Sequence, residues 1–146
     1  MTTIADIMTR RTITVEMDDS LSLVRDLFED KRFHHLLVLD HGRLVGVLSD
    51  RDLLRNISPF VGKFSERSQD AACLRRRVHQ IMTRRLVCIS HDESVEEGAR
   101  RMLTHGVACL PVVDHAQRCV GIITWHDLLH FAYAQPEQID GTVEAA

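Results

Sequence analysis

The stretch Ile7-Met8-Thr9-Arg10-Arg11 occurs a second time, 74 residues later, as Ile81-Met82-Thr83-Arg84-Arg85. Further identities keep this spacing through the middle of each copy. The spacing then becomes 75 residues, so that Asp52-Leu53-Leu54 matches Asp127-Leu128-Leu129. Five consecutive identities followed by a constant spacing are hard to obtain by chance. The chain is therefore a duplicated unit, and its architecture follows from the repeat.

Each copy predicts the same order of elements, β-α-β-β-α. A β-prone run at 12–15 in the first copy corresponds to 86–89 in the second, and a helical pattern follows each run. Two apolar strands joined by a tight turn, with Gly42 in the first copy, precede a final helix. We expect an α/β (α+β) fold of two tandem repeats with pseudo-twofold symmetry, each a short three-stranded sheet covered by helices.

The first helix of each copy carries its own signals. Ser20 and Ser94 are predicted N-caps, and Ser94-Val95-Glu96-Glu97 matches the capping box with Glu97 at its third helical position. The predicted buried faces are Leu21, Val24, Leu27 and Phe28 in one copy, and Val95, Ala99, Met102 and Leu103 in the other.

Four segments follow from this pattern. Residues 1–56 form the first repeat and residues 78–134 the second. The intervening segment 57–77 is too long for a simple turn and is expected to hold a short helix. Residues 135–146 are polar and are expected to form a flexible tail.

Composition narrows the class of protein. The chain has 146 residues, 45% hydrophobic and 27% charged, which is typical of a soluble globular protein. Its net charge of −3 provides no global positive field for nucleic acid or a membrane surface. The longest apolar run, 36–39, is far shorter than the ~20 residues of a membrane span, and we find no signal peptide. We therefore expect a cytoplasmic protein.

Its four cysteines lack a Cys-x-x-Cys pair, so buried thiols are favoured over a disulfide framework or a zinc site.

The second copy carries the motifs in their clearest form. After Ile81-Met82-Thr83 come Leu110-Pro111-Val112-Val113-Asp114, Val120-Gly121-Ile122-Ile123-Thr124 and the helix start Thr124-x-x-Asp127. These motifs resemble the CBS domain, and two registered copies resemble the CBS pair, or Bateman module. The whole chain is similar to stand-alone bacterial CBS-pair proteins, including the acetoin-utilisation type.

The resemblance implies a regulatory module that is not an enzyme. It would bind an adenine nucleotide or a related adenosyl ligand, with AMP or ATP favoured, in the cleft between the repeats, and it would use no other cofactor. The implied partners are a second copy of the chain, in a homodimer, and an unknown effector protein, with no nucleic acid and no membrane.

Ser49-x-x-Asp52 and Thr124-x-x-Asp127 each follow a strand and open a helix, and two interpretations remain open. In the first, each pair is a capping box that contributes about 0.5–2 kcal/mol to stability. In the second, the free amides of the helix start favour a phosphate, and the carboxylate accepts the hydroxyls of a ribose. In CBS domains the Asp is the usual ribose ligand, and the hydroxyl residue assists it.

The resemblance places the Asp of one copy opposite the adenine wall of the other. For Val47, Val107, Ala108 and Ile122, a plain core position is an equally good interpretation. The predicted ribose- and phosphate-binding residues are Ser49, Asp52, Thr124, Asp127, Arg51, His126 and His35. The predicted adenine-binding residues are Thr9, Thr14, Phe33, His34, Val47, Thr83, Cys88, Val107, Ala108 and Ile122.

Two differences between the copies predict that the sites differ in affinity or ligand. Pro111 corresponds to Leu37, and His34-His35 corresponds to Ala108-Cys109.

Other functions find less support. A structural dimerisation module with degenerate pockets is the main alternative, although both hydroxyl-Asp pairs are retained. No Ser-His-Asp signature, Gly-rich phosphate loop or metal triad indicates an enzyme. His126 and His130 have a spacing that can bind a metal, but no further ligand pair supports it, so no metal site is predicted.

Overall fold

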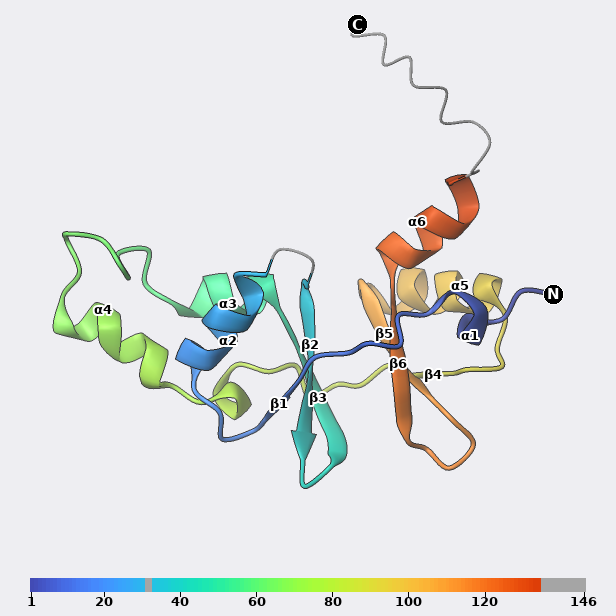
Figure 1. Cartoon of the computed structure of the whole chain (residues 1–146), viewed down its shortest axis with the longest axis horizontal. Coiled ribbons are helices and arrows are strands. Elements are labelled where there is room, and N and C mark those ends of the chain that lie inside the picture. The colour runs from blue at the N-terminus through green and yellow to red at the C-terminus, as the bar shows by residue number, and fades with distance from the viewer. Residues whose placement is uncertain (31–32, 135–146) are drawn as a thin grey trace, which may run out of the picture.

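The computed structural model describes residues 1–30 and 33–134 of the chain and shows two small sheets side by side, each covered by its own helices (Figure 1). The predicted tail, 135–146, lies outside the described residues. The first repeat contains β1 (Thr14–Glu16), α2 (Leu21–Phe28), β2 (His35–Asp40), β3 (Arg43–Ser49) and α3 (Asp50–Asn56). The second contains β4 (Ile89–Ser90), α5 (Val95–His105), β5 (Cys109–Val113), β6 (Cys119–Thr124) and α6 (Trp125–Tyr133).

The predicted order β-α-β-β-α is therefore confirmed in both copies. In each sheet the first strand pairs in parallel with the second, and the second pairs antiparallel with the third. Four shorter helices precede or join these units: α1 (Ile4–Ile7), α4 (Ser68–Ala72), η1 (Cys73–Arg75) and η2 (Val78–Gln80).

The first strand of each sheet begins later than the sequence predicts. β1 begins at Thr14, not at position 12, and β4 begins at Ile89, not at position 86. Both strands start late because the segments before them first cross the junction between the repeats. There Thr9 pairs with Ile122 of the second sheet, and Thr83 pairs with Val47 of the first.

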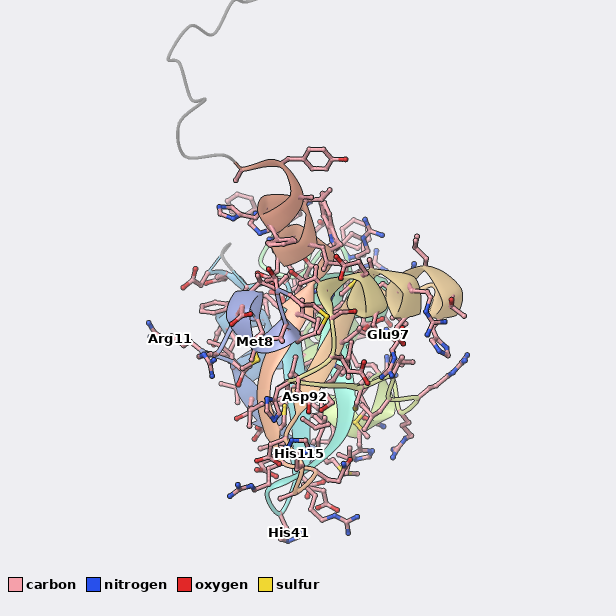
Figure 2. The ribbon with its side chains drawn as sticks, turned by 90° about the vertical axis from the view of Figure 1, so that its right-hand side faces the viewer. Met8, Arg11, His41, Asp92, Glu97 and His115 are labelled. Atoms are coloured by element: carbon pink, nitrogen blue, oxygen red, sulfur yellow. The ribbon has the colours of Figure 1, made fainter. Side chains whose placement is uncertain are left out.

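The helix caps are confirmed, but one capping box is wrong. The Ser20 Oγ accepts a hydrogen bond from Leu23 N at 3.3 Å, and the Ser94 Oγ accepts one from Glu97 N at 3.1 Å. The Glu97 carboxylate, which lies on α5 in Figure 2, binds Arg100 at 2.6 Å and Arg101 at 2.9 Å. These two arginines hold the carboxylate and lower the pKa of Glu97, and the carboxylate does not return a hydrogen bond to the Ser94 backbone.

The apolar face of α5 is narrower than predicted. Val95, Gly98 and Met102 are buried, whereas the Leu103 side chain is 85% exposed. Gly98 brings the helix so close to Ile4 that an added Cβ would lie 2.8 Å from the Ile4 Cδ1. The helix therefore packs against the core through the face that contains Gly98, and Leu103 lies on the opposite, solvent-exposed face.

The repeated Ile-Met-Thr segments cross between the repeats. Ile4 and Met8, from the N-terminus, pack in the core of the second repeat with residues such as Leu110. Val78 and Met82 pack reciprocally in the core of the first repeat. Each repeat therefore completes its core with a segment that precedes the other repeat's first strand.

Backbone hydrogen bonds fix both crossings. Thr9 and Ile122 exchange two N–H···O bonds of 2.8 and 2.9 Å, and Thr83 and Val47 exchange two of 2.9 and 3.0 Å. A small apolar cluster of Leu37, Cys109 and Ile122 lies between the two sheets. The junction thus combines a pseudo-twofold pair of β-bridges with apolar packing.

The crossing depends on a glycine opposite Thr9. A Cβ at Gly121 would lie 2.8 Å from the Thr9 backbone oxygen and 2.9 Å from the Met8 Sδ. We expect Gly121→Ala to lower the free energy of unfolding by about 1–3 kcal/mol, because the backbone must shift to relieve the clash. Urea unfolding followed by circular dichroism measures this change.

Gly98→Ala is the matched control for this variant. Its Cβ would also meet an atom at 2.8 Å, but that atom is the flexible Ile4 Cδ1. Alanine also stabilises a helix interior by roughly 0.5–1 kcal/mol relative to glycine. Equal destabilisation by the two substitutions would contradict the importance of the Thr9 crossing.

Candidate functional site

A cleft of about 830 Å³ opens between the two repeats and is lined by both of them. We call it the Asp127 cleft. It lies where the N-termini of α3 and α6 approach the segment ahead of β1 and the start of β2. The first repeat contributes Thr9, Arg11, Thr12, Ile13, Phe33, His34, His35, Leu37, Ser49, Asp50 and Arg51. The second contributes Ala108, Ile122, Thr124, Trp125, His126 and Asp127.

Asp127 connects the two repeats within this cleft. Its Oδ2 accepts hydrogen bonds from the Thr124 backbone N at 2.9 Å and the Thr124 Oγ1 at 3.2 Å. Its Oδ1 accepts one from the Thr9 Oγ1 at 3.2 Å. The capping box is therefore present, yet one carboxylate oxygen still faces a hydroxyl of the opposite repeat. The capping role of Asp127 is thus confirmed, and its geometry leaves the ribose-binding interpretation open.

Asp52 has the same local geometry in the first repeat. Its Oδ2 accepts from Ser49 N at 2.9 Å, and its own N–H donates to the Ser49 Oγ at 3.1 Å. Asp52 does not line the Asp127 cleft, and its carboxylate lies near the Cys109 thiol of the second repeat. Each Asp therefore faces a residue of the opposite repeat: Asp127 faces Thr9, and Asp52 faces Cys109.

The structure brings together one group of the predicted residues and leaves the rest elsewhere. Arg11, one of the paired arginines that the sequence marks as able to reach the cleft, lies in its lining, and so do Asp50 and Trp125, which the sequence did not single out. Asp50 and Trp125 follow the capping residues Ser49 and Thr124 directly, which is the signal that points to them. In the cleft lie Thr9, Phe33, His34, His35, Ser49, Arg51, Ala108, Ile122, Thr124, His126 and Asp127. Outside its lining lie Thr14, Val47, Asp52, Thr83, Cys88 and Val107.

The first-repeat wall of the cleft carries two adjacent histidines. The His34 Nδ1 lies 3.0 Å from the Asp50 Oδ2. Partial burial lowers the pKa of His35, and the nearby Asp50 carboxylate opposes this shift. Burial therefore favours the neutral form of His35.

The hydroxyl groups of Thr9, Thr124 and Ser49 bond to protein groups at the two helix starts. Thr9 and Thr124 donate to the Asp127 carboxylate, and Ser49 accepts from a backbone amide.

Among residues 1–30 and 33–134, no group of three or more His, Cys, Asp or Glu side chains is placed to hold a metal ion. Over the same residues, no helix has the length and apolar character needed to cross a bilayer.

Cys109 lies near Asp52 at the junction between the repeats, and all four cysteines of the chain are free thiols. Burial raises the pKa of Cys109 to about 12, with a further contribution from the Asp52 carboxylate. Burial also raises the pKa of Cys88 and of Cys119. These thiols act as small apolar groups, because their thiolate forms are suppressed.

The burial of Cys109 predicts slow alkylation. A rise in its pKa from 9.0 to about 12 lowers the thiolate fraction at pH 8 by roughly 1,000-fold. We therefore expect iodoacetamide to modify Cys109 at least ~100-fold more slowly in the folded protein than in 8 M urea. Mass spectrometry of the Cys109 peptide measures both rates. Equal rates would show that the junction opens freely.

The comparisons with known proteins agree with this architecture. The CBS domain family matches residues 4–59 and 78–134. A CBS domain-containing protein of Dictyostelium discoideum is 32% identical over 128 residues, which cover 86% of this chain and 88% of the relative. A homoserine O-acetyltransferase of Methanococcoides burtonii is 30% identical over 87% of this chain, but the match spans only 23% of that enzyme.

Solved structures share the fold over nearly the whole chain. The CBS domain pair of protein MJ0100, in complex with 5′-methylthioadenosine and S-adenosyl-L-methionine, has a TM-score of 0.73 at 26% identity and covers 90% of this chain and 95% of that one. A Vibrio cholerae protein named for acetoin utilization (AcuB) has the same TM-score and identity, with 90% of each chain covered. CBSX2 in complex with AMP has a TM-score of 0.71 at 28% identity, covering 89% and 95%. The chain therefore belongs to the CBS domain family, as a tandem pair of these domains.

Proposed function

We propose that this CBS pair is a regulatory module that binds an adenine nucleotide or a related adenosyl ligand in the Asp127 cleft and signals to a partner protein. The observation that carries the proposal is the Asp127 carboxylate, which lies in a cleft of about 830 Å³ and faces residues of the opposite repeat. The similar structures with AMP and with S-adenosyl-L-methionine support this ligand class.

The residues of the cleft suit the parts of such a ligand. Asp127 Oδ1 is available to a ribose hydroxyl, because the 3.2 Å hydrogen bond that it accepts from the Thr9 Oγ1 is one that a ligand can replace. Phe33 and Ile122 offer apolar surface to the base. The N-terminus of α6 and the cation Arg51 favour phosphate.

A ligand in this position has a direct route to conformational change. Thr9 belongs to the segment that crosses between the repeats, and it contacts both Asp127 and the backbone of Ile122. A ligand that competes for Asp127 would break the hydrogen bond from Thr9 and so weaken one of the contacts that hold this segment against the second repeat. The populations of the two repeats' relative positions would then shift with ligand concentration, which is what a sensor requires.

The module is proposed to regulate and not to catalyse. The cleft hydroxyls bond to carboxylates or amides, and the enzyme relative matches the chain over only 23% of its own length. The free thiols suit a reducing compartment, which supports a cytoplasmic protein. A structural dimerisation module with degenerate pockets remains the alternative.

Asp127→Ala tests the proposal against a purely structural role. We expect the variant to lose roughly 10–150-fold in AMP affinity, because it loses a charge-assisted hydrogen bond of about 1.5–3 kcal/mol. Isothermal calorimetry measures the affinity, and a thermal melt measures the loss of the cap, about 1 kcal/mol. The parent protein with AMP at 100 times its dissociation constant should gain about 2.7 kcal/mol in stability.

Asp52→Ala is the matched control, since it removes the same cap in the other repeat. It should leave binding in the Asp127 cleft intact and remove only binding at the second site. Asp127→Asn keeps a hydrogen-bond acceptor without the charge, so it should fold normally and still bind more weakly. If the parent binds neither AMP, ATP nor S-adenosylmethionine, the structural alternative is favoured.

We further propose a homodimer built from helix faces. Leu54 on α3 is 69% exposed, and its repeat counterpart Leu129 on α6 is 46% exposed. Trp125, one turn before Leu129 on α6, is also exposed. A twofold-symmetric pair would cover these faces.

Light scattering tests the homodimer. At tens of micromolar we expect a mass of twice the 16.7 kDa chain. We expect the Leu54→Asp, Leu129→Asp double variant to shift toward the monomer, because a charge on each face opposes burial. A parent protein that stays monomeric at this concentration would refute the proposal.

A further inference from the structure

A second pocket lies in the first repeat, away from the junction between the repeats. It has a volume of about 620 Å³ and is formed by α2, the C-terminal part of α3 and the residues that follow α3. Figure 1 shows α2, α3 and α4 grouped at the end of the molecule opposite α5. The pocket shares no lining residue with the Asp127 cleft. We call it the Arg25 pocket.

The Arg25 side chain is incompletely paired at this pocket. Among residues 1–30 and 33–134, its Nε is the one buried side-chain nitrogen or oxygen atom that has no hydrogen-bond partner. At the far end of the guanidinium, Nη2 lies 3.7 Å from the Asp26 Oδ1. Because a buried donor without an acceptor is unfavourable, this geometry favours an acceptor that arrives from outside the chain.

Apolar surface surrounds this donor. The walls come from α3 and the segment after it, through Leu54, Ile57, Pro59 and Val61. Leu54 is 69% exposed, so part of this apolar surface is accessible from solvent. Apolar walls beside one unpaired cationic donor suit a ligand that combines an apolar body with one anionic acceptor.

Hydrogen bonds hold the outer wall of the pocket in place. The Ser58 Oγ donates to the Asp70 Oδ1 at 2.7 Å, and the Ser58 backbone N–H donates to the Cys73 Sγ at 3.3 Å. The Val61 N–H donates to the Ser58 backbone oxygen at 3.3 Å and closes a turn, which Gly62 continues with a φ of 75°. The wall is therefore formed by contacts within the chain and does not need a ligand to order it.

The internal repeat shows that this pocket is not a general feature of the unit. At the spacing of 74 residues, Arg25 corresponds to Ala99, and Glu29, which also lines the pocket, corresponds to Leu103. The second repeat thus has neither the guanidinium nor the carboxylate at these positions. The Arg25 pocket is therefore a feature of the first repeat alone and does not follow from the shared fold.

We propose that the Arg25 pocket binds a small monocarboxylic acid with an apolar body, such as a branched aliphatic or an aromatic acid, whose carboxylate accepts a hydrogen bond from the Arg25 Nε. A guanidinium pairs with a carboxylate through charge-assisted hydrogen bonds. The volume of about 620 Å³ is within the range of small-molecule sites. The negative charge of Glu29 opposes a second anionic group, so a single carboxylate is favoured. This site is independent of the proposed adenylate site.

Titration of the full chain with benzoate, followed through the amide signals in NMR spectra, tests the site. Benzamide has the same shape without the charge and is the comparison probe. Because ligands of this size bind weakly, both are titrated to about 10 mM. We expect benzoate to shift the amide signals of α2, α3 and residues 57–62, and to bind at least about tenfold more tightly than benzamide.

Two substitutions in the pocket have opposite expected effects. Arg25→Met keeps a long apolar side chain and removes the donor, so benzoate affinity should fall by about tenfold or more, to the level of benzamide. Glu29→Gln removes a competing negative charge, so benzoate affinity should rise by about two- to fivefold. Arg100→Met is the control, because it removes an exposed arginine from α5 of the second repeat. It should leave benzoate binding unchanged.

Three results would overturn the inference. The first is equal affinity for benzoate and benzamide, and the second is a benzoate affinity that Arg25→Met leaves unchanged. The third is a set of benzoate shifts confined to the surroundings of Thr9 and Asp127, which would assign the acid to the Asp127 cleft. If Arg25→Met does not fold in a thermal melt, Arg25→Lys takes its place, since it keeps the charge but lacks the guanidinium N–H groups. It should also bind benzoate more weakly than the parent.

A contact between copies of the chain is the competing explanation for the unpaired Arg25 Nε. It would be favoured, and the inference overturned, if the parent bound no benzoate and Arg25→Met shifted a parent dimer toward the monomer in light scattering. AMP binding is measured separately. Its absence would refute the proposed function and leave this inference standing, because the two sites share no lining residue.

Discussion

The exchange of the two Ile-Met-Thr segments is the interaction on which the rest of the structure depends. Thr9 pairs with Ile122, and Thr83 pairs with Val47, each through two backbone hydrogen bonds. A three-stranded sheet with two helices is too small to bury a sufficient core by itself. Each repeat is completed by apolar side chains that arrive from the other, so the two repeats depend on one another for their stability.

The same exchange creates the site. By pairing with Ile122, the Thr9 segment brings its hydroxyl to the Asp127 carboxylate and forms one wall of the cleft. The cap at Asp127 uses mainly Oδ2, which leaves Oδ1 directed at the opposite repeat. The stabilising role of Asp127 is therefore compatible with the ligand-binding role that we propose, because the cap leaves Oδ1 to the Thr9 hydroxyl alone.

The pseudo-twofold symmetry is geometric, while the chemistry of the two sides differs. His34 and His35 occupy the positions that Ala108 and Cys109 hold in the other repeat. One side thus carries two imidazoles, and the other has a buried thiol whose pKa is raised to about 12. Duplication preserves the backbone frame, while a few side chains give the two sides of the junction different chemistry.

The sequence by itself determined the duplication, the order β-α-β-β-α, the caps at Ser20 and Ser94, and the paired hydroxyl-Asp motifs, because these depend on local spacing and propensity. The strand starts, the partners of Glu97 and the exposure of Leu103 depend on contacts with distant residues, and local patterns do not encode such contacts. The resemblance placed Asp127 opposite the first repeat, but only the tertiary structure decided that Arg11 and Asp50 share this cleft and that Asp52 lies outside it. The reason is that the crossing of the Thr9 segment, fixed by hydrogen bonds to a strand more than a hundred residues away, decides which side chains share a wall.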